Sequence, residues 1–463
     1  MNSHFSVVVR CKPSAEEKAW RCGTTDLEYA GEDGAHLKLE FDRVFPDSVT
    51  HAELYEQSIE PHVASTLQGG NVAVVVYGPP CSGKSHTVFG TSGQIRIKKE
   101  ARGVIIRCGQ QIFDALEKED RSGSIYRITT TFCHVFEDGR IADLFDTKKR
   151  SLDISENPAT MTYTVANLTE HVVSSPHEVL RLVEKGYLMR NASACVREQK
   201  SAVKSPPLQP LQQYRQHGSH AIFRFTIEHL STTPQESSEV SVSHITVVDL
   251  AGRNIEKFHT EMLCSDVGIE TLHKVLNTLP EAGIIAASTL FPKSSLTKVL
   301  KPCFGGNCHT IIIGNVCLNE SSATTTRKCL ELLQATRRIK NFSKAITIPL
   351  LQTKLGKCLE EAKSLKAEVN AKLQISSAIH SWERENASSI KVNGTTYDNL
   401  STSCQDIVKR IAAVESQLIH AGQPVRQAVA RYRISGIGKR LHAFITLWYI
   451  HPNIWPLEIS PVK

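Results

Sequence analysis

The sequence predicts an α/β fold in which a central, mostly parallel sheet is flanked by helices. An all-apolar run from Val72 to Val76 stands directly before a glycine-rich loop and predicts a buried parallel strand. A second apolar run begins at Ile245 and ends in Asp249, with Gly252 shortly after it. Segments with helical spacing, such as 54–67 and 104–116, lie between strand-like segments, as in layered α/β domains.

The loop after the first apolar strand carries a phosphate-binding motif. Gly78, Gly83, Lys84 and Ser85 fit G-x-x-x-x-G-K-[ST] at every required position. Such a loop between a strand and a helix points backbone N–H groups at one spot, where the helix adds partial positive charge. Lys84 is then expected to reach the β- and γ-phosphates, and the Ser85 hydroxyl to ligate Mg²⁺. The alternative, a glycine-rich turn with a chance lysine, is disfavoured by the strand before it.

The other elements are predicted from hydrophobic periodicity and from the positions of Pro, Gly and other turn-forming residues. Residues 39–46 alternate as a half-buried strand, and 125–145 predict two strands around a turn at 137–139. Residues 176–189 predict a helix with Pro176 near its start and Gly186 near its end. Residues 198–217 are rich in Pro and Gln and predict an irregular insertion.

Composition excludes several classes of protein. No apolar run approaches the ~20 residues that a membrane span needs, and no apolar targeting segment opens the sequence. The thirteen cysteines form no C-x-x-C pair, so they predict reduced thiols rather than a zinc site or a disulfide framework. The net charge is +7, and residues 346–463 supply most of it, with fifteen Lys and Arg against nine Asp and Glu.

Taken in order, these landmarks resemble those of a kinesin motor domain over the first ~340 residues. The segments are 10–13 (R-x-R-P), 41–45 (F-D-x-V-F), 71–87 (strand and phosphate loop), 167–176 (G-L-T-E…V-x-S), 219–223 (the end of switch I), 248–252 (switch II) and 296–316 (L-T-x-L-L…G-G-N-x-x-T…A-N-V). Each motif is common by itself. Their shared order is what identifies the resemblance.

The resemblance implies a P-loop NTPase of the kinesin-motor fold that binds ATP or ADP with Mg²⁺ and associates with microtubules. It places Ser85 and Asp249 at the metal, and Ser219 and Gly252 at the reacting phosphate. It implies a cytoplasmic, cytoskeletal location. The implied nucleotide-binding residues are Arg10, Pro13, Gly78, Pro79, Pro80, Cys81, Ser82, Gly83, Lys84, Ser85 and His86.

Several residues depart from the family pattern. The switch I arginine falls on Gly218 and its switch II glutamate partner on Asn254, so both halves of the usual ion pair are missing. The switch I serines fall on Gln216 and His217, and Pro79-Pro80-Cys81 replaces the usual Gln-Thr-Gly. Nucleotide binding is therefore expected to persist while hydrolysis is slow, altered or absent, because hydrolysis depends on positioned charge-stabilising groups. A remaining alternative is that Ser219, Arg215 or Arg253 takes over these roles.

The segment that corresponds to the microtubule-binding loop of kinesins is also altered. Residues 280–288 correspond to a basic loop of the family and contain no Lys or Arg. Lys293, Lys298 and the run 148–150 remain nearby. Attraction of the head to acidic tubulin is therefore expected to be weak and sensitive to salt.

The expected domains are a motor domain at 1–345 with the insertion at 198–217, a short helical neck at 346–385, a linker at 386–403 and a basic, aromatic tail at 404–463. Leu355, Leu359, Ala362 and Leu365 fall near helical spacing without a strict coiled-coil register, which predicts a monomer or weak dimer. The tail is expected to dock on the motor, on tubulin or on a cargo protein rather than on nucleic acid.

Two functions of different classes remain. One is a microtubule-associated ATPase with weakened turnover. The other is a non-motile scaffold that keeps the fold and binds nucleotide or acts purely structurally. A guanine-nucleotide switch is excluded, because the sequence contains no apparent N-K-x-D motif.

Overall fold

The computed structural model describes residues 4–14, 19–30, 36–91, 98–119, 125–157, 162–201, 219–230, 239–252, 266–349 and most of 355–368. The chain divides into two compact units, residues 1–353 and 354–463. In the second unit the described residues are helical, and Leu355, Cys358, Ala362 and Leu365 are buried at spacings of three and four along one helix face. The linker and tail predicted at 386–463 lie outside the described residues.

A mixed sheet in the first unit runs in the order β11-β7-β12-β13-β6-β14-β1-β5. The pairs from β13 through β6, β14 and β1 to β5 are parallel, whereas β12, β7 and β11 pair antiparallel. The strands are β1 (Phe5–Lys12), β5 (Arg43–Phe45), β6 (Val72–Tyr77), β7 (Ile125–Phe136), β8 (Ile141–Asp143), β11 (His171–Val172), β12 (Ser219–Leu230), β13 (Glu239–Asp249), β14 (His309–Cys317) and β15 (Ile346–Pro349). The predicted α/β architecture is confirmed.

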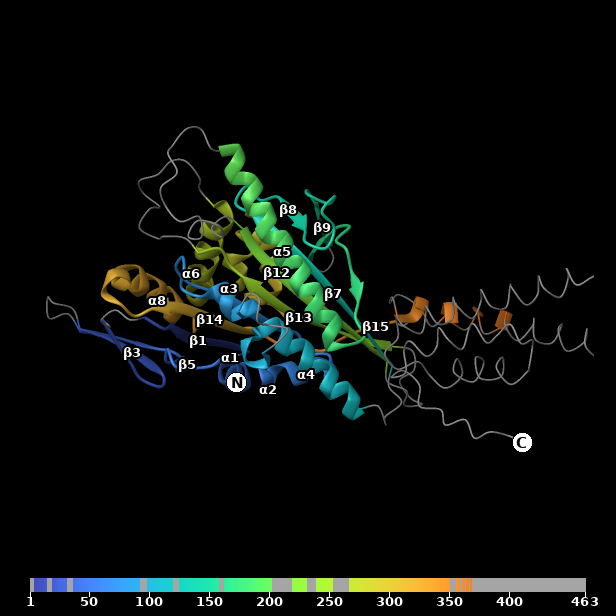
Figure 1. The fold of residues 1–463 in the computed structure, drawn as a ribbon, viewed down its shortest axis with the longest axis horizontal. Coiled ribbons are helices and arrows are strands. Elements are labelled where there is room, and N and C mark those ends of the chain that lie inside the picture. The colour runs from blue at the N-terminus through green and yellow to red at the C-terminus, as the bar shows by residue number, and fades with distance from the viewer. Residues whose placement is uncertain are drawn as a thin grey trace, which may run out of the picture. The chain divides into compact units, whose positions relative to one another are not determined.

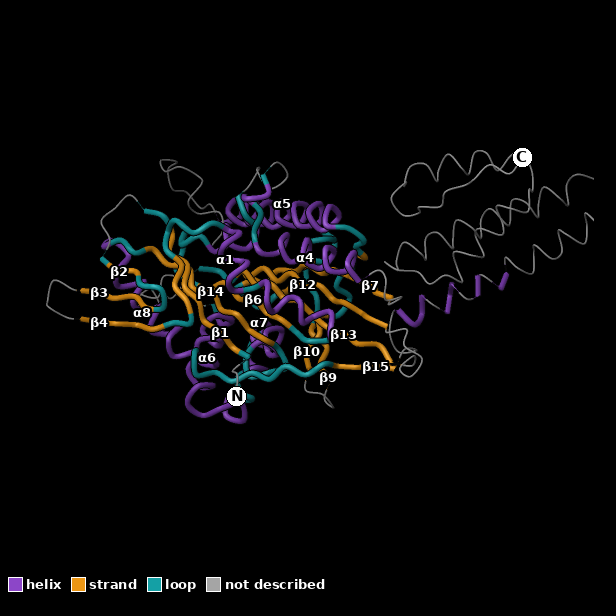
Figure 2. The backbone as a smooth tube through the Cα atoms, turned by 90° about the horizontal axis from the view of Figure 1, so that it is seen from below, coloured by secondary structure: helices purple, strands orange, loops and turns teal. Residues whose placement is uncertain are grey.

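Helices cover both faces of this sheet. Figure 2 shows α1, α4 and α5 on one side of the strands and α6 and α7 on the other. The helices are α1 (His51–Ser58), α2 (Glu60–Val63), α3 (Lys84–Phe89), α4 (Val104–Glu119), α5 (Pro176–Ser201), α6 (Val267–Ala287), α7 (Ser295–Leu300) and α8 (Ala323–Thr336). No helix among the described residues is long and apolar enough to cross a membrane.

Two small sheets complete the fold. They are formed by β2 (Trp20–Cys22), β3 (Asp26–Ala30) and β4 (His36–Glu40), and by β9 (Ile154–Asn157) with β10 (Thr162–Val165). The single strand predicted at 39–46 is wrong, because the chain turns at Asp42 and its halves join different sheets. The Asp42 carboxylate accepts a bond from the backbone of Val7 at 2.6 Å, which fixes this turn.

Strand β6 is buried along its whole length, and β13 is buried from Ile245 to Asp249, as their apolar sequences predict. Parallel strands end at a common edge, so the segments after β1, β6, β13 and β14 meet there. Figure 1 shows α3, which follows β6, among these elements. This edge positions the site described below.

Helix α5 does not end near Gly186 as predicted, but continues to Ser201. Gly186 is instead required by packing, because a Cβ atom there would lie 2.2 Å from Cδ1 of Phe132. The Phe132 ring is itself surrounded by the rings of Phe89, Phe145 and Phe223. The glycine therefore allows the helix to approach the sheet closely.

Gly186→Ala is expected to destabilise the protein by about 1–3 kcal/mol through overpacking. The direction of this change in stability is informative, because alanine ordinarily stabilises a helix interior by about 1 kcal/mol relative to glycine. Urea unfolding of the variant measures the change. Phe132→Leu in the same chain is expected to recover part of the loss, and a stabilised Gly186→Ala variant would contradict the packing account.

Candidate nucleotide site

The segments that carry the predicted site residues meet at the carboxyl edge of the parallel strands. Arg10 and Asn315 are direct neighbours on β1 and β14, and Tyr77 of β6 pairs with Gly314 of β14. Gly78 to Ser85 follow β6, while Asp249 to Gly252 end β13. The topology therefore brings together residues that lie more than 200 positions apart in the sequence.

The loop from Gly78 to Ser85 is folded tightly against β14. A Cβ atom at Gly78 (φ 152°) would lie 2.1 Å from the backbone oxygen of Asn315, so only glycine fits. Gly83 has φ 95°, and Cys81 adopts a positive φ of 57° without being glycine. Ser82 closes the loop by donating to the Pro79 carbonyl at 2.9 Å. Close approach and positive φ values are features of loops that cradle phosphate.

Lys84 is buried at the start of α3. Its ammonium group donates to the Pro79 carbonyl at 2.5 Å, inside the loop. Burial lowers the pKa of Lys84 to about 8, and the nearby Asp249 carboxylate opposes that effect. The group is thus mostly protonated at neutral pH and available to an anion in the loop.

Ser85 and Asp249, the two residues expected at the metal, lie in contact. The Ser85 hydroxyl donates to Oδ2 of Asp249 at 2.6 Å, while Oδ1 of Asp249 is buried without a hydrogen-bond partner among the described residues. A hydroxyl and a carboxylate oxygen are ligands that suit Mg²⁺. The unpartnered oxygen and the glycine-lined loop both fit a magnesium–nucleotide complex.

Arg190 of α5 is a further residue at this site, and it was not predicted from the sequence. Its Nη1 pairs with Oδ2 of Asp249 at 2.5 Å, and its Nη2 donates to the Ser219 carbonyl at 2.8 Å. Its guanidinium group also lies 5.9 Å from the centre of the Phe89 ring. Arg190 therefore ties the end of β13 to the start of β12, although the only sequence signal for it is one charge within a helical stretch.

The segment from Ala251 to Gly252 lies on the phosphate loop. A Cβ atom at Gly252 would stand 2.3 Å from Nζ of Lys84 and 2.8 Å from the nitrogen of Pro80. Ser219, the other residue expected at the reacting phosphate, begins β12 two residues before Ala221, which pairs with Asp249, and its carbonyl accepts from Arg190. Gly218 and Asn254, which replace the usual ion pair, lie outside the described residues.

His220 joins this segment to α6. Its Nδ1 accepts from the Ala251 N–H at 3.1 Å, so its Nε2 carries the proton that faces Oδ2 of Asp266 at 3.1 Å. The other oxygen of Asp266 accepts from the Ile269 N–H and caps α6. Both side chains are fully buried. This bridge was also missed, because nothing in the sequence pairs positions 220 and 266.

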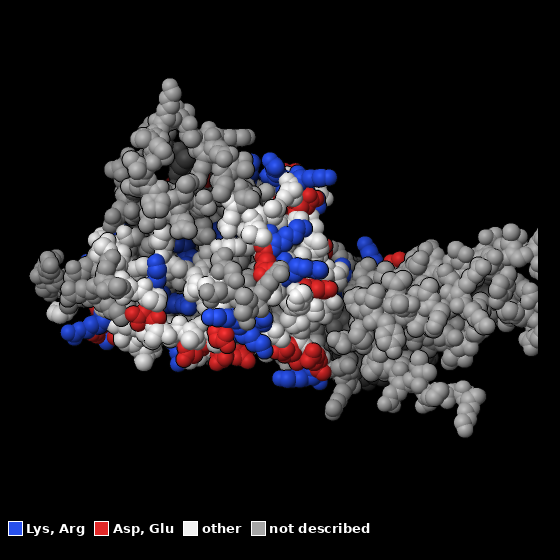
Figure 3. Space-filling view, viewed as in Figure 1, with Lys and Arg blue, Asp and Glu red and all other residues white. Residues whose placement is uncertain are grey.

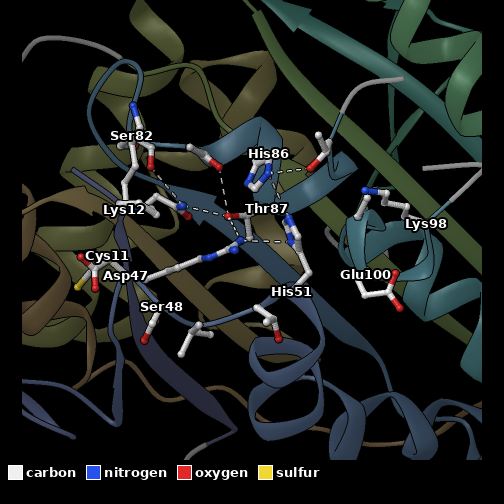
Figure 4. Close-up of a pocket in the computed structure, with 18 residues that line it drawn as sticks. Cys11, Lys12, Asp47, Ser48, His51, Ser82, His86, Thr87, Lys98 and Glu100 are labelled. Atoms are coloured by element: carbon white, nitrogen blue, oxygen red, sulfur yellow. Dashed lines mark hydrogen bonds between the residues drawn. The ribbon is translucent and has the colours of Figure 1, made fainter. Parts of the chain in front are cut away.

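A cavity of about 380 Å³ opens beside the loop. Figure 4 shows His51 and His86 side by side, next to Thr87. The lining includes the predicted residues Arg10, Pro13, Ser82, Gly83 and His86, together with His51, Lys98 and Asn315, which were not predicted. Such a cavity, adjoining the loop, suits the base and sugar of a nucleotide.

Hydrogen bonds order the inner wall of the cavity. Buried Arg10 donates to Oγ1 of Thr87 at 2.9 Å and lies 3.3 Å from Nδ1 of His51. Because arginine can only donate, Nδ1 of His51 is the acceptor and its Nε2 carries the proton toward Nε2 of His86, 3.4 Å away. Burial first, and then the charges of Arg10, His86 and Arg107, lower the pKa of His51 to about 3.

Because His51 is neutral in the folded protein, we expect the stability of the protein to fall in acid. The unfolded chain takes up a proton near pH 6.5 that the folded site excludes until about pH 3, so this stability is present above pH 6.5 and is lost as the pH falls. When the pH falls from 7.5 to 5, the free energy of unfolding of His51→Gln is expected to rise by about 1–2 kcal/mol relative to that of the wild type. Melting temperatures across this range test it, with exposed His177→Gln as the control. Parallel curves for the wild type and His51→Gln would refute it.

Known proteins show what this arrangement is similar to. The sequence model of the kinesin motor domain matches residues 23–339. The chain belongs to the kinesin motor domain family. Kinesins bind ATP or ADP with Mg²⁺. The matched range contains the loop from Gly78 to Ser85 and Asp249, whereas Arg10 and Pro13 precede it.

Individual kinesins are distant relatives. The kinesin-like protein KIN-5C of Nicotiana tabacum is 28% identical over 408 residues, which cover 80% of this chain and 38% of the relative. The kinesin-1 heavy chain of Homo sapiens is 27% identical over 348 residues, covering 73% of this chain and 33% of the relative. The chain thus spans about a third of the length of these relatives.

A solved structure described as that of a fast kinesin superposes with a TM-score of 0.63 at 25% identity. The match covers 76% of this chain and 96% of the solved chain. The predicted kinesin-motor fold is confirmed. The described residues contain no cluster of three or more His, Cys, Asp or Glu side chains that could hold a metal ion.

Proposed function

We propose that this chain binds ATP or ADP with Mg²⁺ at the loop from Gly78 to Ser85, and that it acts on microtubules with weakened or absent ATP turnover. The observation that carries the proposal is the contact between Ser85 and Asp249 beneath a glycine-lined loop that adjoins the 380 Å³ cavity. In this proposal Arg10, Pro13 and His86 hold the base side. Residues 78–85 surround the phosphates.

In this proposal each residue of the site has its own role. Ser85 and Asp249 would hold Mg²⁺, which supplies neutralisation of phosphate charge when bound. Lys84 binds the phosphates, and Gly252 is placed to turn its N–H toward the terminal one because it lies against Lys84 and Pro80. Ser219 is the candidate group near the attacking water. Both assignments to Ser219 and Gly252 remain proposals.

The weakened turnover is inferred from the absence of the arginine–glutamate ion pair that closes the site in kinesins. Gly218 and Asn254 stand where kinesins have an arginine and a glutamate, so no ion pair of those residues closes the site. Removing a single positioned donor in a hydrolase costs about 10²–10³ in rate. Binding needs the loop and the cavity, and both are present in the described residues.

Weak microtubule binding is inferred from the surface that follows switch II. Helix α6 continues to Ala287 across a kink at Gly283, whose backbone is not helical, so most of the stretch that corresponds to the basic loop of the family is helix here. This stretch has no Lys or Arg, and its Ile285 is 85% exposed. Lys149 donates to Asn167 and Thr169, while Lys298 and Lys301 lie over the Tyr163 ring. On the opposite side of the sheet, over α4 and α5, Figure 3 shows acidic and basic side chains interspersed.

The second candidate is a non-motile scaffold on microtubules, which the pairing of Arg190 with Asp249 favours because the arginine occupies a carboxylate that turnover requires. In either case we propose a cytoplasmic, cytoskeletal location and a monomer or weak dimer. The tail is then available to a cargo or partner protein.

Phosphate release with and without microtubules distinguishes the two candidates. A microtubule-stimulated rate, slow relative to an active kinesin measured alongside, supports the weakened ATPase. Nucleotide binding without any stimulation supports the scaffold. A folded protein that binds no nucleotide would contradict both nucleotide-dependent proposals.

A further inference from the structure

The phosphate loop has two ends with different surroundings. The inner end, Ser82 and Gly83, lines the open cavity together with Thr87 of α3. The outer end consists of Pro79, Pro80 and Lys84, and Asp249 and Gly252 lie beside it. None of these five residues lines the cavity.

Gly252 identifies the outer end with the terminal phosphate. Its backbone lies against Pro80, since a Cβ atom there would stand 2.8 Å from both the nitrogen and Cα of Pro80. The same atom would stand 2.3 Å from Nζ of Lys84, the side chain expected at the β- and γ-phosphates. Pro79 and Pro80 therefore occupy the part of the loop that faces a third phosphate.

That part of the loop has lost donors. Proline has no backbone N–H, so two successive positions of the loop cannot donate to an anion. The Pro79 carbonyl points inward instead and accepts from both Lys84 and Ser82. From Cys81 to Ser85 every residue keeps its N–H. The cradle is thus complete for the inner phosphates and depleted at the outer end.

The carboxylate at the outer end is also engaged. Oδ2 of Asp249 accepts from Ser85 and pairs with Arg190, whose guanidinium is buried against Phe89. A third phosphate brings additional negative charge next to this carboxylate.

We propose that this site selects nucleoside diphosphates over nucleoside triphosphates, because Pro79 and Pro80 give the outer end of the loop no backbone N–H donors and the Asp249 carboxylate there is already paired with Arg190. The proposal rests on the proposed function, that the loop binds a nucleotide. It assigns the preference to residues 79 and 80, where the usual Gln-Thr of kinesins would supply two N–H groups.

Competition binding tests the selectivity on the full chain. A fluorescent adenosine diphosphate is displaced by unlabelled ADP or by a non-hydrolysable ATP analogue, with Mg²⁺ present. We expect ADP to bind at least about tenfold more tightly than the analogue, the scale of a lost hydrogen bond to a charged group. Equal affinities, or a preference for the analogue, would overturn the proposal.

Pro79→Gln combined with Pro80→Thr restores two backbone N–H donors. It is expected to reduce the ratio of ADP affinity to analogue affinity to about threefold or less. Pro80→Ala alone restores one N–H with little added volume and should narrow it part-way, so the assignment stays testable if the double variant misfolds. Exposed Pro292→Gln is the matched control and should leave the ratio unchanged. An unchanged ratio in folded Pro80 variants would overturn the assignment, whereas a folded wild type that binds neither nucleotide would overturn the proposed function as well.

Discussion

Replacing Lys84 with alanine is expected to weaken nucleotide binding by about 10- to 100-fold, because a buried ammonium in the loop is lost as a donor to phosphate. Lys84 is the charged side chain that the loop itself encloses, hydrogen-bonded to the Pro79 carbonyl at 2.5 Å. Its pKa of about 8 leaves it mostly charged at pH 7. Calorimetric titration with ADP and Mg²⁺ measures the loss.

Exposed Lys118→Ala, near the end of α4, removes the same charge away from the site and is the matched control. It should leave affinity within about twofold, since an exposed, distant charge is screened. Unaltered ADP affinity in a folded Lys84→Ala protein would mean that the loop does not hold the phosphates.

Replacing Asp266 with alanine is expected to lower the free energy of unfolding by about 2–4 kcal/mol. The substitution leaves the Nε2–H of buried His220 without its acceptor, which costs about 1–3 kcal/mol, and removes the cap of α6, which costs about 1 kcal/mol. Urea unfolding reports the change. Asp266→Asn keeps an oxygen for the cap and should lose less.

The control is Glu331→Ala, which breaks an exposed Arg327–Glu331 pair and should cost under about 0.5 kcal/mol. A loss for Asp266→Ala no larger than that of the control would show that the His220 bridge contributes little. A large loss would identify the bridge as the buried connection between β12, the end of β13 and α6.

The phosphate loop could be predicted because its signal is local. Strand, glycines, lysine and serine are contiguous from Val72 to Ser85, and the loop geometry follows from residues that are neighbours in sequence. The fold class followed in the same way, from apolar strands buried on both faces.

The partners of the site could not be predicted, because each comes from a distant element. Arg190 reaches Asp249 across 59 positions, and His51 lies 35 positions from His86. Periodicity places such residues on a helix or strand but does not say which side chain faces the site. One residue was also misinterpreted, because Gly186 allows helix α5 to approach Phe132 rather than ending the helix.

Direct binding of nucleotide to the wild-type chain is the decisive measurement. Titration of the folded protein with a fluorescent adenine nucleotide and Mg²⁺ should give a saturable, one-to-one signal that unlabelled ADP reverses. Protein that melts cooperatively yet gives no saturable signal would show that the loop from Gly78 to Ser85 no longer holds phosphate, and would contradict the account.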